Sequence, residues 1–392
     1  MNFPFSTNSM VSAKIQSLII SFLLFCIVLS LTFPKYLEIL KHPSPSDVYG
    51  HFFYKIQHPF TPGTQVSTAS HESKIAFRLT APLIAKLIGV QPGASGRSVV
   101  WLYVLQSVLL IPFLYMLQNL LKRYTSLNNS LLFVVACCAT YLAKSFFWDY
   151  DFWFDGFAFF FILASMYFRH IIPVVVFSQL ACWTDERAVA AMAGVYLFHL
   201  LREVNFEAAV KLNKQLFINS FYKGPTSYIF LSCMLYVGLR LMLLQIFGLS
   251  TPRGEAAGVS LSLIPFQFQH RLVGIFLTFE GLWIIFTLTM LHIYKTGDRL
   301  WFYLIGLILL MQLLIAYSVF DITRSITYAF PLFIITFIIF SRIKSETSFS
   351  TIVISTLICI AIPTQFLIFF PRQIPWTILS MQELKPIIKT LL

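Results

Sequence analysis

Acidic, basic and aromatic residues interrupt an otherwise apolar chain at several separate places. The densest group runs from Trp148 to Asp155 and sets three aspartates among large aromatic residues. Asp151 and Asp155 are one helical turn apart and therefore share a face. Aromatic rings beside carboxylates can hold a sugar by stacking and by hydrogen bonds to its hydroxyls. Trp148, Asp151, Trp153 and Asp155 are thus candidate substrate-binding residues; an aromatic belt at the membrane interface is the alternative interpretation.

A second acidic position lies shortly after the first apolar segment, in Ser46-Asp47-Val48-Tyr49. A carboxylate in an extramembrane loop can act as a general base that deprotonates or orients an acceptor. Asp47 is therefore the candidate catalytic residue. The same dipeptide, Ser46-Asp47, also suits a helix N-cap, and a solvated loop carboxylate explains it equally.

Three consecutive charges, Asp185-Glu186-Arg187, separate two short apolar segments. Charges at that depth need partners or water. Arg187 can bind a phosphate through two parallel hydrogen bonds, with Asp185 or Glu186 holding its guanidinium. These three residues are candidate substrate-binding residues, with a turn of solvated charges as the alternative.

Two further arginines are candidates for contact with a phosphate. Asp321 can cap the helix that begins in Phe320-Asp321-Ile322-Thr323-Arg324, and Arg324 can point back to the interface. Arg78 lies in the short apolar stretch from Phe77 to Ala85, which we expect to form a surface helix. Both arginines suit a lipid phosphate or pyrophosphate, and both equally suit snorkelling to the interface.

Arg240 and Glu280 belong to apolar segments, and at about 1.5 Å per residue both reach the middle of a membrane. We expect a buried ion pair between adjacent helices there. A polar pathway is the alternative.

Sequence motifs for soluble nucleotide chemistry and for metal binding are missing. The chain has no phosphate-binding glycine-rich loop, no HExxH and no G-x-S-x-G. Its six cysteines form no CxxC pair. A divalent cation between Asp47 and Asp155 is compatible with these residues but is not required, so the cofactor stays undetermined. The net charge of +12 falls mostly in short loops, which indicates membrane topology rather than nucleic-acid binding.

The elements that must position these residues are transmembrane helices. Hydrophobic residues make up 58% of the 392 residues and charged residues 11%, against about 25% charged in soluble domains. Several apolar runs reach the ~20 residues that span ~30 Å of hydrocarbon. We predict an all-α integral membrane protein with a single domain, residues 1–392. About eleven spans are expected: 15–33, 98–120, 131–147, 152–168, 171–183, 188–201, 228–249, 272–294, 300–319, 325–340 and 351–370.

Charge also predicts the orientation of these spans. With a cytoplasmic N-terminus, the inside loops hold the basic set that the positive-inside rule expects. We expect a retained first helix rather than a cleaved signal. Residues 34–97 then form the first extracytoplasmic loop, with short surface helices and active-site residues, and residues 202–225 form a cytoplasmic connector. All the candidate site residues come to the outer face.

This plan resembles the C-type glycosyltransferase superfamily of polytopic membrane enzymes. Asp47 occupies the position of the acid that follows the first span in that family. The stretch from Ser70 to Lys74, followed by Phe77 to Ala85, is similar to one in poorly characterised bacterial members. The placements of Asp155-Gly156, Asp185-Glu186-Arg187 and Asp321…Arg324…Pro331 look like theirs. The chain departs from many relatives in showing one acid instead of an acidic pair, and we expect no soluble C-terminal domain of the kind that they have.

The resemblance implies a multi-pass enzyme of the bacterial plasma membrane. It would move a sugar from a polyprenyl-phosphate-linked donor to a lipid or glycan acceptor at the extracytoplasmic face. The expected partners are that donor, that acceptor and membrane lipids, and no nucleic acid. The alternatives are an O-antigen or exopolysaccharide polymerase, and a transporter or flippase, which predicts paired discontinuous helices and an internal repeat.

Overall fold

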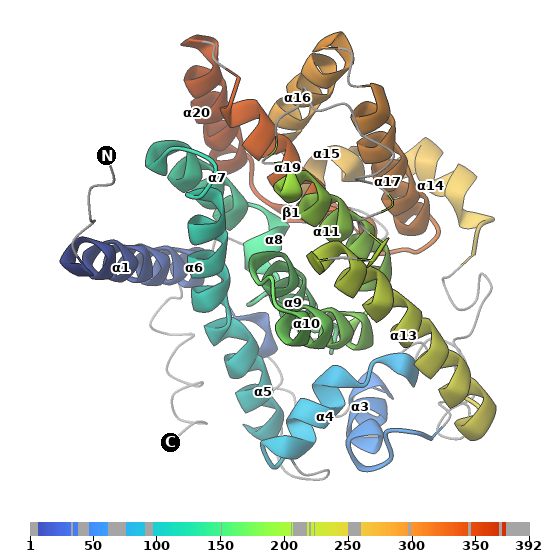
Figure 1. The fold of residues 1–392 in the computed structure, drawn as a ribbon. Coiled ribbons are helices and arrows are strands. Elements are labelled where there is room, and N and C mark those ends of the chain that lie inside the picture. Colours follow the sequence, from blue (N-terminus) through green and yellow to red (C-terminus); the bar gives the residue numbers. More distant parts are fainter. Residues whose placement is uncertain are drawn as a thin grey trace.

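The computed structural model is nearly all α-helix, which confirms the predicted class (Figure 1). The structure describes residues 7–32, 34–37, 47–61, 76–90, 97–149, 151–204, 206, 218, 221–222, 224–249, 260–296, 299–343, 346–367 and 371–373. Its elements are α1 (Thr7–Leu31), η1 (Lys35–Leu37), α3 (Asp47–Gln57), α4 (Thr80–Leu87), α5 (Arg97–Val108), α6 (Leu110–Leu121), α7 (Leu127–Ala139), α8 (Tyr141–Lys144), α9 (Asp155–Tyr167), α10 (Ile171–Thr184), α11 (Arg187–Glu203), α13 (Gly224–Phe247), α14 (Leu263–Arg271), α15 (Val273–Phe279), α16 (Leu282–Thr296), α17 (Arg299–Tyr317), α18 (Ile322–Thr327), α19 (Phe330–Ser341), α20 (Glu346–Ala361), β1 (Gln365–Leu367) and β2 (Pro371–Gln373).

Within the described ranges, four helical stretches are long and apolar enough to cross a membrane: Lys14–Leu31, Val99–Leu121, Gly224–Phe247 and Arg299–Tyr317. The pair α15 and α16 would make a fifth, although the two helices are bent by 99°. Five more apolar helices are shorter, at 10–17 residues. The chain thus has the long apolar helices of a membrane protein.

Three of the four long apolar helices in the described ranges lie at the outside, whereas the shorter α19 lies inside. Of the most apolar 18 residues of α1, only 17% are buried, and the corresponding shares for α13 and α17 are 22% and 28%. In α19, by contrast, all residues from Phe330 to Phe340 are buried. In Figure 1, α1 extends to one side of the bundle. It packs against α6 and α7. Exposed apolar faces of this size suit hydrocarbon.

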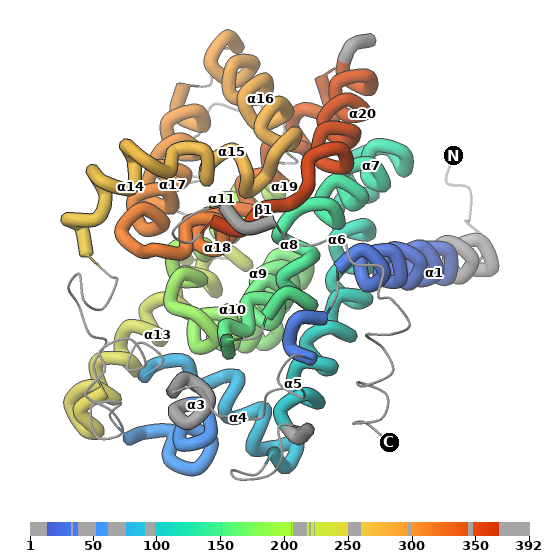
Figure 2. The backbone as a smooth tube through the Cα atoms, turned by 180° about the vertical axis from the view of Figure 1, so that it is seen from behind, coloured from blue at the N-terminus to red at the C-terminus, as the bar shows by residue number. Residues whose placement is uncertain are grey.

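The interior is built around α9, which packs against α6, α10 and α11. A second group joins α19 to α11, α16 and α20. Helices α3 and α4 pack against each other at one end of the molecule, on the side away from α7, α16 and α20 (Figure 2). The short strands β1 and β2 pair antiparallel, with Gln365 opposite Gln373.

Several expected spans are interrupted. The run 131–147 is helical only to Ala139 and continues as the one-turn α8, while the run 325–340 is divided into α18 and α19. The run 272–294 breaks at Glu280, whose φ of 46° is a left-handed value that side chains avoid. These breaks occur where polar side chains are held inside the protein, which the hydropathy of a run cannot show.

The two expected loops are described only in part. Two of the anticipated short helices in residues 34–97 are present as α3 and α4. Residues 38–46, 62–75 and 91–96 of that loop lie outside the described residues, as does 207–217 of the connector at 202–225.

Candidate functional site

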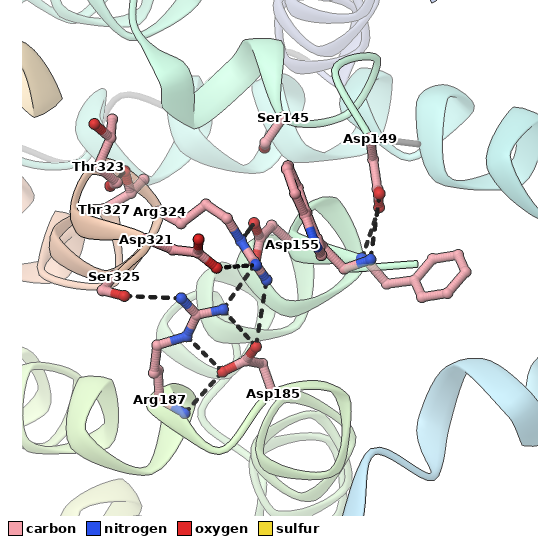
Figure 3. Close-up of polar contacts among 12 residues, drawn as sticks. Ser145, Asp149, Asp155, Asp185, Arg187, Asp321, Thr323, Arg324, Ser325 and Thr327 are labelled. Carbon is pink, nitrogen blue, oxygen red and sulfur yellow. Dashed lines mark hydrogen bonds and ion pairs between the residues drawn. The ribbon is translucent and has the colours of Figure 1, made fainter. Parts of the chain in front are cut away.

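Six charged residues from four distant parts of the chain meet at one buried cluster, which we call the Asp–Arg cluster. It combines a residue before α4 with the start of α9, the α10–α11 turn and the region of α18, of which the last three are seen in Figure 3. Its members are Arg78, Asp155, Asp185, Arg187, Asp321 and Arg324. The three positive charges balance the three negative charges.

Asp155 lies at the centre of the cluster and is 1% exposed. Arg324 donates to both of its oxygens, from Nε to Oδ2 at 2.6 Å and from Nη2 to Oδ1 at 3.1 Å. The hydroxyls of Tyr141 and Tyr328 each donate to it at 3.0 Å. Arg187 Nη2 is 3.7 Å from Oδ1. A buried carboxylate with this many donors is held in one orientation.

Asp185 binds the second arginine through two parallel contacts. Arg187 Nε donates to Oδ1 at 2.8 Å and Nη2 to Oδ2 at 2.6 Å. Arg78 Nη2 lies 3.1 Å from Oδ2. Burial by itself would raise the pKa of Asp185, but Arg187 and Arg78 together hold it well below its usual range. Arg187 Nη1 also donates to Ser325 at 2.8 Å, which ties the α10–α11 turn to α18.

The rim of the cluster consists of Asp321, Arg78 and Trp153. Arg324 Nη1 donates to Asp321 Oδ2 at 2.8 Å, and the side chain of Asp321 is 29% exposed. The Arg324 guanidinium lies 4.5 Å from the centre of the Trp153 ring. Arg78 is 18% exposed, and its buried Nε has no hydrogen-bond partner among the described residues. Asp321 and Arg78 therefore retain contact capacity for a ligand, whereas Trp153 is 8% exposed and its ring also stacks on Phe366, 5.3 Å away between ring centres.

Asp149 organises the loop that carries Trp153 and Asp155. Its carboxylate accepts from the backbone N–H groups of Asp151 at 3.3 Å, Trp153 at 3.2 Å and Phe154 at 2.6 Å. The loop is tight, because Phe152 and Phe154 have φ values of 58° and 55°. Burial, and then the charge of Asp155, raises the pKa of Asp149 to about 7.

The structure brings together most of the residues that the sequence singled out, with Trp153 stacked on the cluster. Asp151 is half-buried beside it, and burial raises its pKa. Trp148 is not part of it and lies under Lys35 Nζ, 5.6 Å from the ring centre.

One other predicted residue stands apart from the cluster. Glu186 pairs with Arg240 at 2.9 Å. Asp47 is the first residue of α3, and its side chain lies outside the described residues.

The expected ion pair between Arg240 and Glu280 is wrong. Arg240 pairs with Glu186 and lies 4.1 Å from the Phe77 ring centre. Both carboxylate oxygens of Glu280 lack a hydrogen-bond partner among the described residues. The expected pair assumes that both helices run straight through the membrane, which would bring Arg240 and Glu280 to the same depth. The chain bends at Glu280, so the two side chains do not meet.

Sequence reasoning missed the neutral donors. Tyr141, Ser325 and Tyr328 lie in runs that read only as apolar spans. One signal was available, because Tyr328 is four residues after Arg324 and so lies on the same helical face. A buried tyrosine hydroxyl also requires a partner.

In the described part of the chain, no group of three or more His, Cys, Asp or Glu side chains is placed to hold a metal ion. A cation between Asp47 and Asp155 stays untested, because the Asp47 side chain is outside that part. Comparison with family models, with curated proteins and with solved structures found no match.

Proposed function

We propose that this chain is a membrane glycosyltransferase that moves a sugar from a polyprenyl-phosphate-linked donor to a lipid or glycan acceptor. The observation that carries the proposal is the Asp–Arg cluster, with its rim of Arg78, Asp321 and Trp153. Arginine is the side chain best suited to a phosphate, and Arg78 and Asp321 are the members of the cluster that remain partly exposed. The resemblance to C-type glycosyltransferases points the same way.

In the proposed reaction, the leaving phosphate contacts Arg324 and Arg78 at the rim. Arg324 makes this contact by exchanging Asp321, the partly exposed member, for the phosphate. An acceptor hydroxyl attacks the anomeric carbon, the bond from that carbon to the phosphate oxygen breaks, and the hydroxyl proton passes to the base. The guanidinium groups stabilise the charge that grows on the leaving group.

Asp47 is the proposed base because α3 lies beside the rim. Phe52 of α3 stacks on Phe152 at 4.7 Å between ring centres and lies 5.3 Å from Phe154. Asp47 is the first residue of the same helix, about 8 Å from Phe52 along the helix axis at ~1.5 Å per residue. Arg78 and Phe52 border one pocket with Phe152 and Phe154.

In this proposal the protein is a multi-pass protein of the bacterial plasma membrane. The shorter apolar helices complete a set of about eleven spans, and the cluster faces the extracytoplasmic side. The charges at the other ends of the helices support this orientation. Burial, together with the nearby Arg169 and Arg123, lowers the pKa of Arg202, so basic residues gather where α9 and α11 end.

A transfer assay tests the proposal. The purified chain in nanodiscs is given polyprenyl-phosphate donors with labelled sugars and an extract of envelope lipids and glycans. We expect labelled product from the parent chain, none from Asp47→Asn, and a loss of at least tenfold from Arg78→Gln. Arg169→Gln, at the opposite end of α9, is the matched control and should keep the parent rate. Undiminished transfer by a folded Asp47→Asn variant would refute the role of the base.

Two alternatives remain, and each is distinguished by what the assay produces. A polymerase would use the same lipid-linked chemistry but yield a ladder of long products on a gel. A transporter or flippase is favoured by one observation, the 99° bend between α15 and α16, because broken helices mark transport sites. Movement of a labelled lipid-linked sugar across vesicles, without any transfer, would support that alternative.

A further inference from the structure

Helix α8 connects the Asp–Arg cluster to a second buried polar region. Its first residue, Tyr141, donates to Asp155, and its last residue, Lys144, donates from Nζ to Thr364 Oγ1 at 2.6 Å. Lys144 is 2% exposed. The charged group that acts on it is Glu280. Neither Lys144 nor Glu280 has a role in the proposed transfer reaction.

Glu280 is a fully buried carboxylate whose hydrogen-bonding capacity is unused. Its exposure is 0%, and neither Oε1 nor Oε2 accepts a hydrogen bond from the described residues. An ionised carboxylate in such a position is far more costly than a neutral acid. Ionisable side chains that are buried inside membrane proteins usually have a function.

The backbone around Glu280 is strained as well. Glu280 ends α15 with φ 46° and ψ −119°, and strain of this kind gathers at functional positions. A hydrogen bond joins the two helices across the bend: Trp283 Nε1 of α16 donates to the carbonyl oxygen of Ile275 in α15 at 2.8 Å. Gly281 lies so close to α20 that a Cβ would be 2.1 Å from the Ser355 carbonyl oxygen. Glu280 is therefore held at a fixed break between two helices.

The groups around Glu280 and Lys144 come from three elements. Lys144 of α8 is the charged one. The charge of Glu280 acts on the thiol of Cys359 in α20. The Sγ of Cys359 donates to the carbonyl oxygen of Phe279 at 3.6 Å. Cys138 of α7 acts on Lys144. The nearby hydroxyl of Ser355, three positions before Ile358 along the face that meets Gly281, is also buried without a hydrogen-bond partner among the described residues.

We propose that Glu280 and Lys144 form a buried proton-binding site at the break between α15 and α16. The site takes a proton rather than a metal cation for two reasons. An ammonium group beside the carboxylate repels a second cation, and a metal ion needs several oxygen ligands that are not gathered here. The proton lies on the carboxylate or on the amine, as Lys-NH₃⁺ and Glu-COO⁻ exchange with Lys-NH₂ and Glu-COOH.

The environment of Lys144 is consistent with this exchange. Its side chain is 2% exposed, and a buried ammonium is far more costly than a neutral amine.

Infrared difference spectroscopy of the parent chain in nanodiscs tests the proposal without relying on activity. Protonated carboxyl groups give a C=O band that shifts when H₂O is replaced by D₂O. We expect such a band at neutral pH that is absent from Glu280→Gln. Lys144→Met should keep the band to higher pH, because the ammonium that favours ionisation is gone. Comparing variants pairwise removes the separate contribution of Asp149.

Glu186→Gln serves as the matched control, because an ion-paired carboxylate should leave the band unchanged. A neutral-pH spectrum of Glu280→Gln identical to that of the parent would overturn the proposal. A band in the parent that disappears on addition of Na⁺ at constant ionic strength would also overturn it, in favour of a cation site. If Glu280→Gln does not fold, Lys144→Met and the Na⁺ titration decide the question. Neither outcome depends on glycosyl transfer.

Discussion

At the scale of single residues, Asp155 holds the candidate site together, because two arginines and two tyrosines converge on it. Removing one member of a buried charge network leaves its partners without compensation. We therefore predict that Asp155→Asn lowers the free energy of unfolding by about 3 kcal/mol or more. Reversible unfolding of both chains in mixed detergent micelles measures this change.

The matched control for that experiment is Glu186→Gln, which breaks the ion pair with Arg240. Both of those side chains are more than a quarter exposed, at 29% and 28%, so the control should cost less than about 1 kcal/mol. Equal losses for the two variants would mean that the cluster adds nothing beyond an ordinary surface pair.

Asp149 predicts a pH dependence of stability. Its folded pKa of about 7 lies above the ~3.9 of an unfolded chain, so the folded state binds the extra proton between these values. Its contribution to stability is therefore present below about pH 4 and is lost as the pH rises to about 7. We expect the difference in stability between the parent and Asp149→Asn to change across that window and to be flat above it. A difference that stays flat from pH 4 to 7 would contradict the raised pKa.

The sequence predicts residue types better than partners. The six charged members of the cluster stand out because charges are rare in this chain and lie at the ends of apolar runs. Which acid meets which base depends on how α8, α18 and the α10–α11 turn pack. Tyr141 and Tyr328 went unnoticed for the same reason, since a tyrosine inside an apolar run does not show what its hydroxyl will contact.

At the scale of elements, the close packing of α16 on α20 depends on Gly281. A Cβ there would lie 2.1 Å from the Ser355 carbonyl oxygen and 2.9 Å from Ile358 Cβ, and backbone cannot move aside cheaply. We predict that Gly281→Ala destabilises the protein by about 3 kcal/mol, at the upper end of overpacking costs. Thermal unfolding monitored by circular dichroism checks the prediction.

Gly306→Ala is the control, because nothing lies within 4 Å of its Cβ position. Gly306 is inside α17, where alanine is the better helix former by up to about 1 kcal/mol. We expect this variant to be as stable as the parent or slightly more stable. A similar loss in both variants would show that helix flexibility, rather than contact with α20, explains the effect.

Helix positions follow from hydropathy, and helix breaks do not. The runs 171–183 and 188–201 correspond closely to α10 and α11, because Asp185-Glu186-Arg187 marks their turn. The run 272–294 looks continuous, since a single glutamate barely lowers its mean hydropathy. Its 99° bend lies at Glu280 and Gly281, where Gly281 meets α20, and no local window contains that contact.

At the scale of the whole molecule, the two ends differ in charge. Asp155 begins α9 and Arg187 begins α11, both within the Asp–Arg cluster, while Arg169 follows α9 and Arg202 ends α11. We predict that cysteines placed at His170 and His58, in a chain without native cysteines, are labelled from opposite sides of a vesicle. His170→Cys should react only from the cytoplasmic side. A membrane-impermeant maleimide makes the measurement, and labelling of both from one side would refute the arrangement.

The short interior helices have an electrical consequence. Helix α9 has 13 residues, which is about 20 Å at ~1.5 Å per residue, against ~30 Å of hydrocarbon. In the proposed arrangement, with Arg169 at the cytoplasmic surface, the cluster at the start of α9 is recessed below the level that α1 and α13 reach. A transmembrane voltage then falls mainly across the short interior. Moving one elementary charge across the whole membrane changes its free energy by about 2.3 kcal/mol at 100 mV. An anionic head group that reaches Arg324 would cross part of that drop, so its affinity should change with membrane voltage, with a sign that identifies the side to which the cluster opens.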